Sequence, residues 1–350
     1  MKVAITSLGL LLTSLWLLPQ PSVSRLADER EVHLKNLRQL TFGGENAEAY
    51  FSFDGKRLIF QSTREGYECD QIFTMNLDGS HVRRVSTGKG RTTCSYFLKD
   101  GQSFIYSSTH FNNESCPPKP DFSQGYVWAI YPDFDIYRSD FAGGLTRLTD
   151  APGYDAEATV APDGSRIVFT SVRDGDLDLY SMNPDGSDIR RLTRTLGYDG
   201  GAFYSPDSRQ IVYRAHHPKT SEEVDRYKTL LKQGLIEPRS LEIFVMQADG
   251  SNSVQVTRNG AANFCPYFHP NGRQILFSSN LGDPKGRNFD LYLINLDGTG
   301  LKQITFNETF DGFPMFSPDG TRLVFASNRN AKVRGETNIF LAEWVENPGK

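Results

Sequence analysis

One short pattern recurs six times along the chain, and a recurring unit constrains a fold more than any other sequence feature. Each copy has a turn pair followed by an alternating apolar run, as in SPDGTRLVFASNRN, residues 317–330, and APDGSRIVFTSVRD, residues 161–174. The turn positions are Asp54, Asp100, Asp163, Asp207, Asn271 and Asp319. They are about 45 residues apart in three intervals and about 64 in two. We therefore expect six equivalent units, two of which carry insertions of about 20 residues.

Five of the copies are followed by a second hairpin, such as LDLYSMNPDGSDIRRLT from Leu177. An Asp-Gly pair between apolar runs is typical of a type I′ turn, because glycine adopts positive φ freely. Two hairpins give four short antiparallel strands, which is the size of one propeller blade. Radial repetition also protects the edges that an open sheet would expose. The sequence thus predicts an all-β fold, a six-bladed β-propeller of four-stranded antiparallel blades.

The last unit ends without the outer strand that completes every other unit. The missing strand stands at the other end of the chain, where VHLKNLRQLT, residues 32–41, has the outer-strand ending with no unit before it. We expect residues 32–41 to pair with the last unit and to close the ring.

These repeats resemble the TolB-type propeller, a WD40-like unit that reads roughly SPDG, a strand, an S-x-R loop, DIY, a second turn and RRLT. The resemblance covers residues 32–345. It implies a TolB-like binding role in the bacterial envelope. We expect no counterpart of TolB's N-terminal α/β domain, since only about 7 residues separate Ser24 from the closing strand.

The first 24 residues have a basic Lys2, an apolar run from Val3 to Leu18 and small residues at Ser22 and Ser24. This pattern indicates a cleaved secretory signal, with a retained anchor as the alternative. We expect residues 25–350 to form a single propeller that is periplasmic or secreted, without stable membrane insertion after cleavage. The formal net charge of −4 gives no reason to expect a nucleic-acid partner.

Export would allow disulfides between the four cysteines. We expect Cys94 to pair with Cys116, because Cys94 begins an inner strand and Cys116 lies in the insertion above the same blade. Cys69 is the competing partner of Cys116.

Both insertions, residues 109–134 and 215–240, follow the second strand of a unit, so we expect them on one face of the ring. Tyr126 and Trp128 in the first insertion would either contact a ligand or pack the loop onto its blade. In the second insertion, Thr220 and Glu223 form a capping box that predicts a short helix.

Polar side chains also recur at the start of each innermost strand, where we expect them to line the mouth of the central channel. The candidates for ligand binding there are Asn46, Glu48, Asp155, Glu157, Asp199, Asn263 and Asp311. Asp155, Asp199 and Asp311 would together bind a cation such as calcium, or each would hydrogen-bond its own loop. Arg64, Arg173 and Arg329 share one position after the second strand, where we expect them to pair with acids of neighbouring blades.

The function that fits these features is a non-catalytic, monomeric binding scaffold for an envelope protein, a peptide or a glycan. The alternative is a metal-dependent lyase or hydrolase acting on glycans through His110, His216 and His217. No G-x-S-x-G motif of a hydrolase is present.

Overall fold

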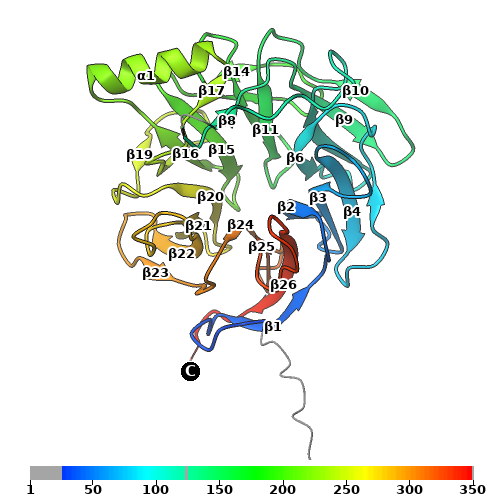
Figure 1. The fold of residues 1–350 in the computed structure, drawn as a ribbon, viewed down its shortest axis with the longest axis vertical. Helices are drawn as coiled ribbons and strands as arrows, with labels where there is room; N and C mark the ends of the chain where they lie inside the picture. Colours follow the sequence, from blue (N-terminus) through cyan, green and yellow to red (C-terminus); the bar gives the residue numbers. More distant parts are fainter. Residues whose placement is uncertain (1–25, 123–124, 349–350) are drawn as a thin grey trace, which may run out of the picture.

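A computed structural model describes residues 26–122 and 125–348 of the chain. The expected signal segment, residues 1–24, lies outside the described residues. Strands arranged in six sheets surround a central axis, as the ribbon in Figure 1 shows. Within the described ranges, no helix has the length and apolar character needed to cross a membrane. The predicted six-bladed β-propeller is confirmed.

Each blade has four antiparallel strands, which are numbered outward from the axis in blades 1 to 5. Blade 1 contains β2 (Glu45–Phe51), β3 (Arg57–Thr63), β4 (Gln71–Asn76) and β5 (Arg83–Arg84). Blade 2 contains β6 (Thr92–Phe97), β7 (Ser103–Ser108), β9 (Asp135–Asp140) and β10 (Leu145–Arg147). Blade 3 contains β11 (Asp155–Val160), β12 (Ile167–Ser171), β13 (Asp178–Met182) and β14 (Arg190–Arg191). Blade 4 contains β15 (Tyr198–Tyr204), β16 (Gln210–His216), β18 (Glu242–Gln247) and β19 (Val254–Gln255). Blade 5 contains β20 (Asn263–Phe268), β21 (Gln274–Ser279), β22 (Asp290–Asn295) and β23 (Lys302–Gln303).

Blade 6 joins the two ends of the described chain. Its inner strands are β24 (Asp311–Phe316), β25 (Arg322–Ser327) and β26 (Asn338–Trp344), and its outer strand is β1 (Leu34–Gln39). β1 pairs antiparallel with β26, placing Leu34 opposite Trp344 and Gln39 opposite Phe340. Figure 1 shows β1 in blue lying beside β26 in red. The expected closure by an N-terminal strand is therefore confirmed.

One hydroxyl group per blade fastens the end of the outer strand to the third strand. In blade 3 the Thr193 hydroxyl donates to the Asp178 carboxylate at 3.2 Å and accepts from the Leu179 amide at 2.9 Å. Ser86, Thr149, Thr257 and Thr305 make the equivalent contacts in blades 1, 2, 4 and 5. In blade 6 the hydroxyl comes from Thr41, which contacts Asn338 and the Ile339 amide. In each blade, the hydroxyl residue of the RLT motif therefore contacts residues of the DIY motif.

The Asp-Gly turns differ from the expected type I′ geometry. In the turn after β4, the Gly79 amide donates to the Asn76 carbonyl at 3.0 Å, and Gly79 has φ of +83° while Asp78 is not among the residues of positive φ. This pattern is a type I turn followed by one left-handed glycine. The Asp78 carboxylate instead accepts from the Ser80 amide at 2.9 Å, which stabilises the turn locally.

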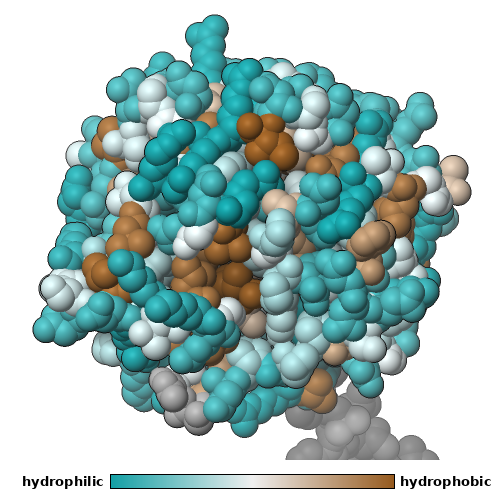
Figure 2. Space-filling view, turned by 90° about the horizontal axis from the view of Figure 1, so that it is seen from above, coloured by the Kyte–Doolittle hydropathy of each residue, from teal (hydrophilic) through white to brown (hydrophobic). Residues whose placement is uncertain are grey.

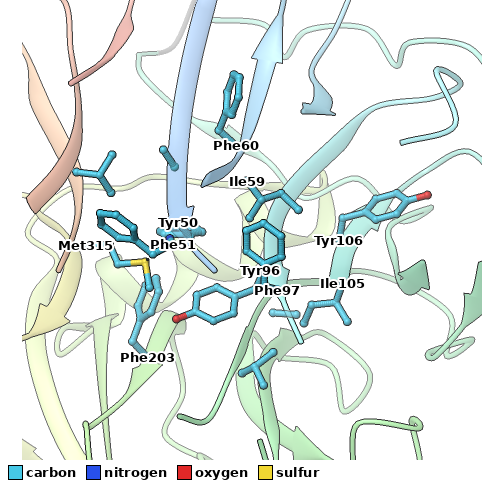
Figure 3. Packing of buried hydrophobic residues seen from close by; sticks show 14 of the residues in the cluster. Tyr50, Phe51, Ile59, Phe60, Tyr96, Phe97, Ile105, Tyr106, Phe203 and Met315 are labelled. Carbon is cyan, nitrogen blue, oxygen red and sulfur yellow. Dashed lines mark hydrogen bonds between the residues drawn. The ribbon is translucent and has the colours of Figure 1, made fainter. Parts of the chain in front are cut away.

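The core consists of the facing surfaces of adjacent blades. Figure 3 shows aromatic and aliphatic side chains of the inner strands interdigitating, among them Phe60, Phe97 and Tyr106, which are fully buried. The outer edge of the ring is mainly hydrophilic, with hydrophobic residues in separate patches (Figure 2). Apolar side chains therefore face the neighbouring blades, as a propeller requires.

Removal of the closing strand tests how far the ring depends on it. A chain that begins at Phe42 loses β1, the buried Leu34 and Leu40 side chains, and the Thr41 hydroxyl contacts. We expect the free energy of unfolding to fall by about 4 kcal/mol or more, from the apolar burial alone. Urea unfolding measures the loss, with Leu34→Ala as a milder variant expected to lose about 2 to 3 kcal/mol. An unchanged midpoint in the truncated chain would contradict the closure.

Candidate functional site: a roofed cavity on the propeller axis

The two insertions meet over the axial face of the ring. β8 (Trp128–Ala129), from the blade 2 insertion, pairs antiparallel with β17 (Leu235–Ile236), from the blade 4 insertion. The Ile130 amide extends this contact by donating to the Gly234 carbonyl at 2.7 Å. Both insertions lie on one face, as expected, but no sequence pattern indicates that they pair. Together they form a roof that spans blade 3.

A helix supports this roof from the outside. α1 (Ser221–Lys232) begins at the capping box that Thr220 and Glu223 form, as predicted from the sequence. It buries Tyr227 and Leu230, and the Tyr227 hydroxyl donates to the Gly197 carbonyl at 2.8 Å. The helix therefore packs on blade 4 and holds the second insertion in place.

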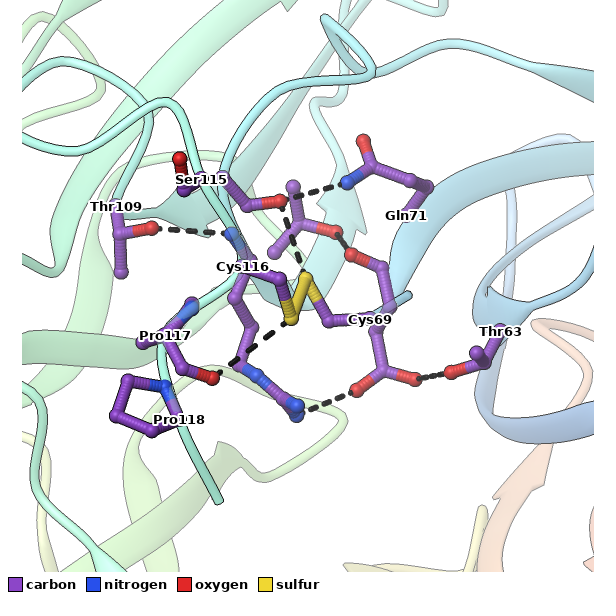
Figure 4. Close-up of a disulfide and its surroundings, with 12 residues drawn as sticks. Thr63, Cys69, Gln71, Thr109, Ser115, Cys116, Pro117 and Pro118 are labelled. Atoms are coloured by element: carbon purple, nitrogen blue, oxygen red, sulfur yellow. Dashed lines mark hydrogen bonds and ion pairs between the residues drawn. A yellow bond between two sulfur atoms is a disulfide. The ribbon is translucent and has the colours of Figure 1, made fainter. Parts of the chain in front are cut away.

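A disulfide fixes the other insertion. It joins Cys116 to Cys69, which lies in the loop between β3 and β4 of blade 1, with the two Cα atoms 5.9 Å apart (Figure 4). The expected Cys94–Cys116 pair is therefore wrong, and the competing partner Cys69 is the observed one. Cys94 is free because its side chain faces the central channel and not the insertion.

A cavity of about 700 Å³ lies beneath the roof on the axis of the ring. A smaller space of about 30 Å³ shares several lining residues with this cavity and reaches Tyr50 and Phe203. These two rings belong to an aromatic layer in which Tyr50, Tyr96, Phe203 and Tyr267 contact one another, with ring centroids 5.2 to 6.3 Å apart. Figure 3 shows Tyr50, Tyr96 and Phe203 converging from three different blades. The layer therefore lies between the cavity and the opposite face of the ring.

Every inner strand has a β-bulge just above this aromatic layer, and each bulge places one residue at the axis. The equivalent residue of each inner strand has a φ between +49° and +60°, and the pairing register shifts at this point in all six blades. These equivalent residues are Glu48, Cys94, Glu157, Gly201, Cys265 and Phe313. We call these six positions the bulge ring. All of them except Gly201 line the cavity. A bulge re-aims a side chain, which is how a buried strand presents it to the axis.

The bulge-ring position of blade 4 is filled from behind by an arginine. Gly201 has φ of +58°, and a Cβ atom there would lie 2.4 Å from the Arg214 guanidinium. Arg214 forms an ion pair with Glu157 at 2.6 Å, donates to the Tyr198 hydroxyl at 2.8 Å and lies over the Trp128 ring at 5.1 Å. Arg214 is buried, so this network is a fixed part of the cavity wall.

Sequence reasoning missed Arg214, although a signal was present. The fifth residue of β16 is arginine, whereas the equivalent positions of the other blades carry Gln61, Ser107, Thr170, Ser278 and Ala326. The Gly200–Gly201 pair of β15 is the matching deviation, because it opens the space that the guanidinium occupies. The sequence therefore departs from the repeat at two positions of blade 4 that face each other, and both lie at the cavity wall.

Glu48 differs from Glu157 in having no basic partner within hydrogen-bonding distance in the described part of the chain. Its carboxyl group is enclosed by the cavity walls, and this desolvation raises its pKa to about 7, although a hydrogen bond with the Cys94 thiol acts in the opposite direction. Burial likewise raises the pKa of Cys94, and that of Cys265 to about 12. The bulge ring thus combines one titratable carboxyl near neutral pH with two neutral thiols.

Two residues before the bulge, the side chains point into the blades and not into the channel. Asp155, Asp199, Asn263 and Asp311 are fully buried and do not line the cavity; Asn46 is buried too, but it contributes to the wall. Asp155 pairs with Arg173 at 2.9 Å, Asp199 with His217 at 2.8 Å, and Asp311 with Arg329 at 2.6 Å. The expectation that these residues jointly line the channel mouth is wrong, because the bulge shifts the alternation of the strand and leaves their side chains pointing into the blade.

This arrangement does not support the calcium site suggested for Asp155, Asp199 and Asp311. Each carboxylate already has a cationic or imidazole partner in its own blade, and the three lie in different blades. Over residues 26–122 and 125–348, no group of three or more His, Cys, Asp and Glu side chains is placed to hold a metal ion. Asp155 and Asp311 are thus paired with arginines of their own blades, whereas Asp199 contacts His217 through one oxygen and its other oxygen is buried without a hydrogen-bond partner.

The three aligned arginines pair within their own blades, which corrects the expectation of contacts between neighbouring blades. Arg173 and Arg329 contact the first acid of their own inner strand, and Arg64 donates to Asn46 of its own blade at 3.0 Å. The loop after the second strand folds back over the start of the first, which brings the two positions together. Arg329 has a second partner, Glu31, from the segment that precedes β1.

The histidines of the alternative hypothesis are likewise separate. His110 hydrogen-bonds to Ser108 at 2.8 Å in blade 2, whereas His217 contacts Asp199 in blade 4 and His216 ends β16 of the same blade. None of the three lines the cavity. The structure therefore does not assemble the suggested histidine site.

The remaining candidates lie where a ligand would contact them. Trp128, from the roof, and Tyr126, on the exposed rim, line the cavity together, and the Trp128 indole donates to the Tyr126 hydroxyl at 3.1 Å. Glu48 and Glu157 project from the bulge ring below them. Of the sequence-predicted residues, Asn46, Glu48, Glu157, Tyr126 and Trp128 thus form part of one site.

Comparisons with known proteins identify the class of the fold and the repeat. No family model matches the chain. A 55-residue stretch is 42% identical to the Tol-Pal system protein TolB of Bordetella pertussis, which is 15% of this chain and 13% of that protein. The matched stretch therefore spans only a small part of that curated relative.

Solved structures are similar over most of the chain. A putative TolB from Agrobacterium tumefaciens has a TM-score of 0.56 at 21% identity, covering 86% of this chain and 91% of that one. An oligogalacturonate lyase in complex with manganese has a TM-score of 0.54 at 15% identity, covering 90% and 94%. Identities this low show a shared fold. The sequence matches and the neighbours together confirm the resemblance to TolB-type propellers.

The disulfide assignment has a direct test. Peptide mapping without reduction should recover Cys69 linked to Cys116, with Cys94 and Cys265 as free thiols. Replacing Cys69 and Cys116 together by serine should lower the free energy of unfolding by about 2 to 4 kcal/mol, because it releases a long closed loop. Cys94→Ser is the matched control and should change stability much less. A recovered Cys94–Cys116 peptide would overturn the assignment.

The environment of Glu48 predicts a pH dependence of stability. A carboxyl whose pKa is raised to about 7 on folding binds protons more tightly in the folded protein. Its contribution is present at low pH and is lost as the pH rises through about 7. We expect the parent to lose on the order of 1 kcal/mol more than Glu48→Gln between pH 5 and 8. Urea unfolding at several pH values measures this difference, and Glu45→Gln on the exposed rim is the control. Parallel curves for the parent and Glu48→Gln would contradict the assigned environment.

Proposed function

We propose that this protein is an exported, non-catalytic binding protein of the bacterial envelope, similar in this respect to TolB. Its ligand, a small molecule or the exposed segment of a partner, would occupy the roofed cavity. The single observation that carries this proposal is the form of the site: a cavity of about 700 Å³ beneath a roof of two paired insertions. Cavities of this volume that combine aromatic and apolar side chains with polar groups are typical of ligand-binding sites.

The chemistry of the bulge ring favours binding over catalysis. Cysteine is a nucleophile as the thiolate, and burial raises the pKa values of both Cys94 and Cys265, which keeps them protonated. Arg214 and Glu157 are committed to one another. The rigid support of the roof, through a disulfide on one side and a helix on the other, suits a site that selects a shape.

The alternative of a glycan-directed lyase has one observation in its favour, the fold shared with an oligogalacturonate lyase. The geometry of this chain weighs against it, since His110, His216 and His217 lie outside the cavity and in two different blades. A stoichiometric transition metal in the purified protein, together with cleavage of uronic-acid glycans, would favour the lyase.

Blocking the cavity tests the proposal. Ala47 lines the cavity, and Ala47→Trp should fill part of it, whereas Ala142→Trp adds the same side chain to an exposed turn of blade 2. Immobilised parent and Ala142→Trp should retain the same partner or ligand from an envelope extract, as identified by mass spectrometry. Ala47→Trp should retain at least tenfold less. Equal recovery by all three proteins would exclude the cavity as the binding site.

A further inference from the structure

The cavity has one aromatic wall, which blades 5 and 6 and the roof provide. The rings of Trp128, Phe264, Phe289, Phe310 and Phe313 follow one another at centroid distances of 5.3, 5.1, 6.1 and 6.1 Å. Each of the five is only partly buried and lines the cavity. Partly exposed aromatic rings in a row offer a surface to the flat or apolar part of a ligand.

The faces of these rings are not equally available. Arg214 already lies over Trp128 and Tyr198. In the parts of the chain that the structure describes, no arginine or lysine lies over Phe264, Phe289, Phe310 or Phe313. The negative faces of these four phenylalanines thus remain free to attract a cation from outside.

The wall that adjoins it on the side of blade 6 is polar and comes from blades 1 and 2. It contains Asn46, Glu48, Gln61, Thr93 and Cys94. Of the acids that line the cavity, Asp70 is paired with Arg91 at 3.0 Å and Glu157 with Arg214 at 2.6 Å, while Glu45 is exposed on the rim. Glu48 is therefore the one enclosed carboxyl of the cavity, within the described residues, that no basic side chain neutralises.

The basic groups of the cavity leave no comparable place for an anion. The Arg214 guanidinium is bound to Glu157 and twice to the Tyr198 hydroxyl. Arg91 is paired with Asp70, and Arg287 is exposed on the rim. Away from the exposed Arg287, an anionic ligand would have to break an existing ion pair, whereas a cationic ligand would meet the unpaired Glu48 carboxyl.

We infer that the cavity binds an organic ammonium compound, with its cationic group on the Glu48 carboxylate and its apolar body against the phenylalanine wall. This inference rests on the proposed function and names the chemical class of its ligand. Carboxylate and aromatic faces act together on such a ligand, since a desolvated ammonium group is stabilised by both. An uncharged or anionic ligand of the same shape would use the apolar wall only.

Binding of this kind depends on pH in a defined direction. Glu48 must be ionised to pair with the ligand, and its pKa of about 7 means that affinity falls as the pH drops below neutrality. The charged and titratable groups that face Glu48 are Tyr50, Asp70, Cys94, Glu157, Arg214 and Cys265. Both thiols stay neutral in this range, and Asp70 and Glu157 are held in ion pairs, so Glu48 should dominate the profile.

Three probes of one shape test the inference with the full mature chain. Benzylammonium is the cation, benzyl alcohol the neutral analogue and benzoate the anion, and Trp128 fluorescence with calorimetry reports occupancy. We expect benzylammonium to bind about tenfold more tightly than either analogue at pH 8, and about tenfold more tightly at pH 8 than at pH 6. Glu48→Gln should abolish both differences while leaving benzyl alcohol unaffected. Phe264→Ala should weaken all three probes.

Several outcomes would overturn the inference. They are equal binding of benzoate and benzylammonium, an unchanged affinity in Glu48→Gln, or no binding of benzylammonium at millimolar concentration. A folded Glu48→Gln variant is expected because glutamine resembles the protonated carboxyl, and circular dichroism checks this. If the probes contradict the ammonium ligand, the proposed binding function is still tested by the Ala47→Trp experiment. The two proposals can therefore be contradicted independently.

Discussion

The contact between Thr41 and strand β26 is the one on which the rest of the structure depends. Its hydroxyl accepts from the Ile339 amide at 2.9 Å and contacts the Asn338 side chain, bringing together residues almost three hundred positions apart. Every other blade makes the same contact within a single unit. Because a propeller has no exposed sheet edge only when the ring is complete, this one long-range copy converts five local blades into a closed fold. Nearby, the buried ion pair of Arg329 with Glu31 and Asp311 fixes the N-terminal segment to the same blade. Losing one member would leave buried charge uncompensated.

The site follows from a second repeated feature, the bulge of the inner strands. Without the bulge, the side chains would alternate strictly. A polar residue at the start of the strand and the residue two positions later would then face the same side. The left-handed residue at the bulge breaks the alternation in each blade and aims Glu48, Cys94, Glu157, Cys265 and Phe313 into the cavity. A repeat that is nearly six-fold in backbone thereby carries several different chemical groups around one axis.

The difference between fold and site explains how much the sequence could predict. The blades, the closing strand and the capped helix follow from turn residues, strand patterns and the Thr220–Glu223 capping box, all of which act locally or repeat. The two insertions are far apart in the sequence and pair only in the tertiary structure, so no local pattern encodes their pairing. The channel-facing assignment is wrong at Asp155, Asp199 and Asp311 because a bulge shifts the alternation by one residue. Arg214 was detectable as a deviation from the repeat, yet its meaning required the space beside Gly201.

The balance of charge in the cavity is the basis for proposing a binding site and not a reacting one. A carboxyl with a pKa near 7 is also what general acid–base catalysis requires, so Glu48 alone does not decide between the two. The proposal of binding rests on the neighbours of Glu48. The thiols beside it are held neutral, the nearest guanidinium is bound to Glu157 and Tyr198, and the roof is fixed by a disulfide and a helix. A reaction would need a second group free to attack, to donate or to stabilise developing charge. Among the described residues of this cavity, the charged groups other than Glu48 are either paired or on the rim, and this is the ground on which we propose recognition by one carboxyl and an aromatic wall.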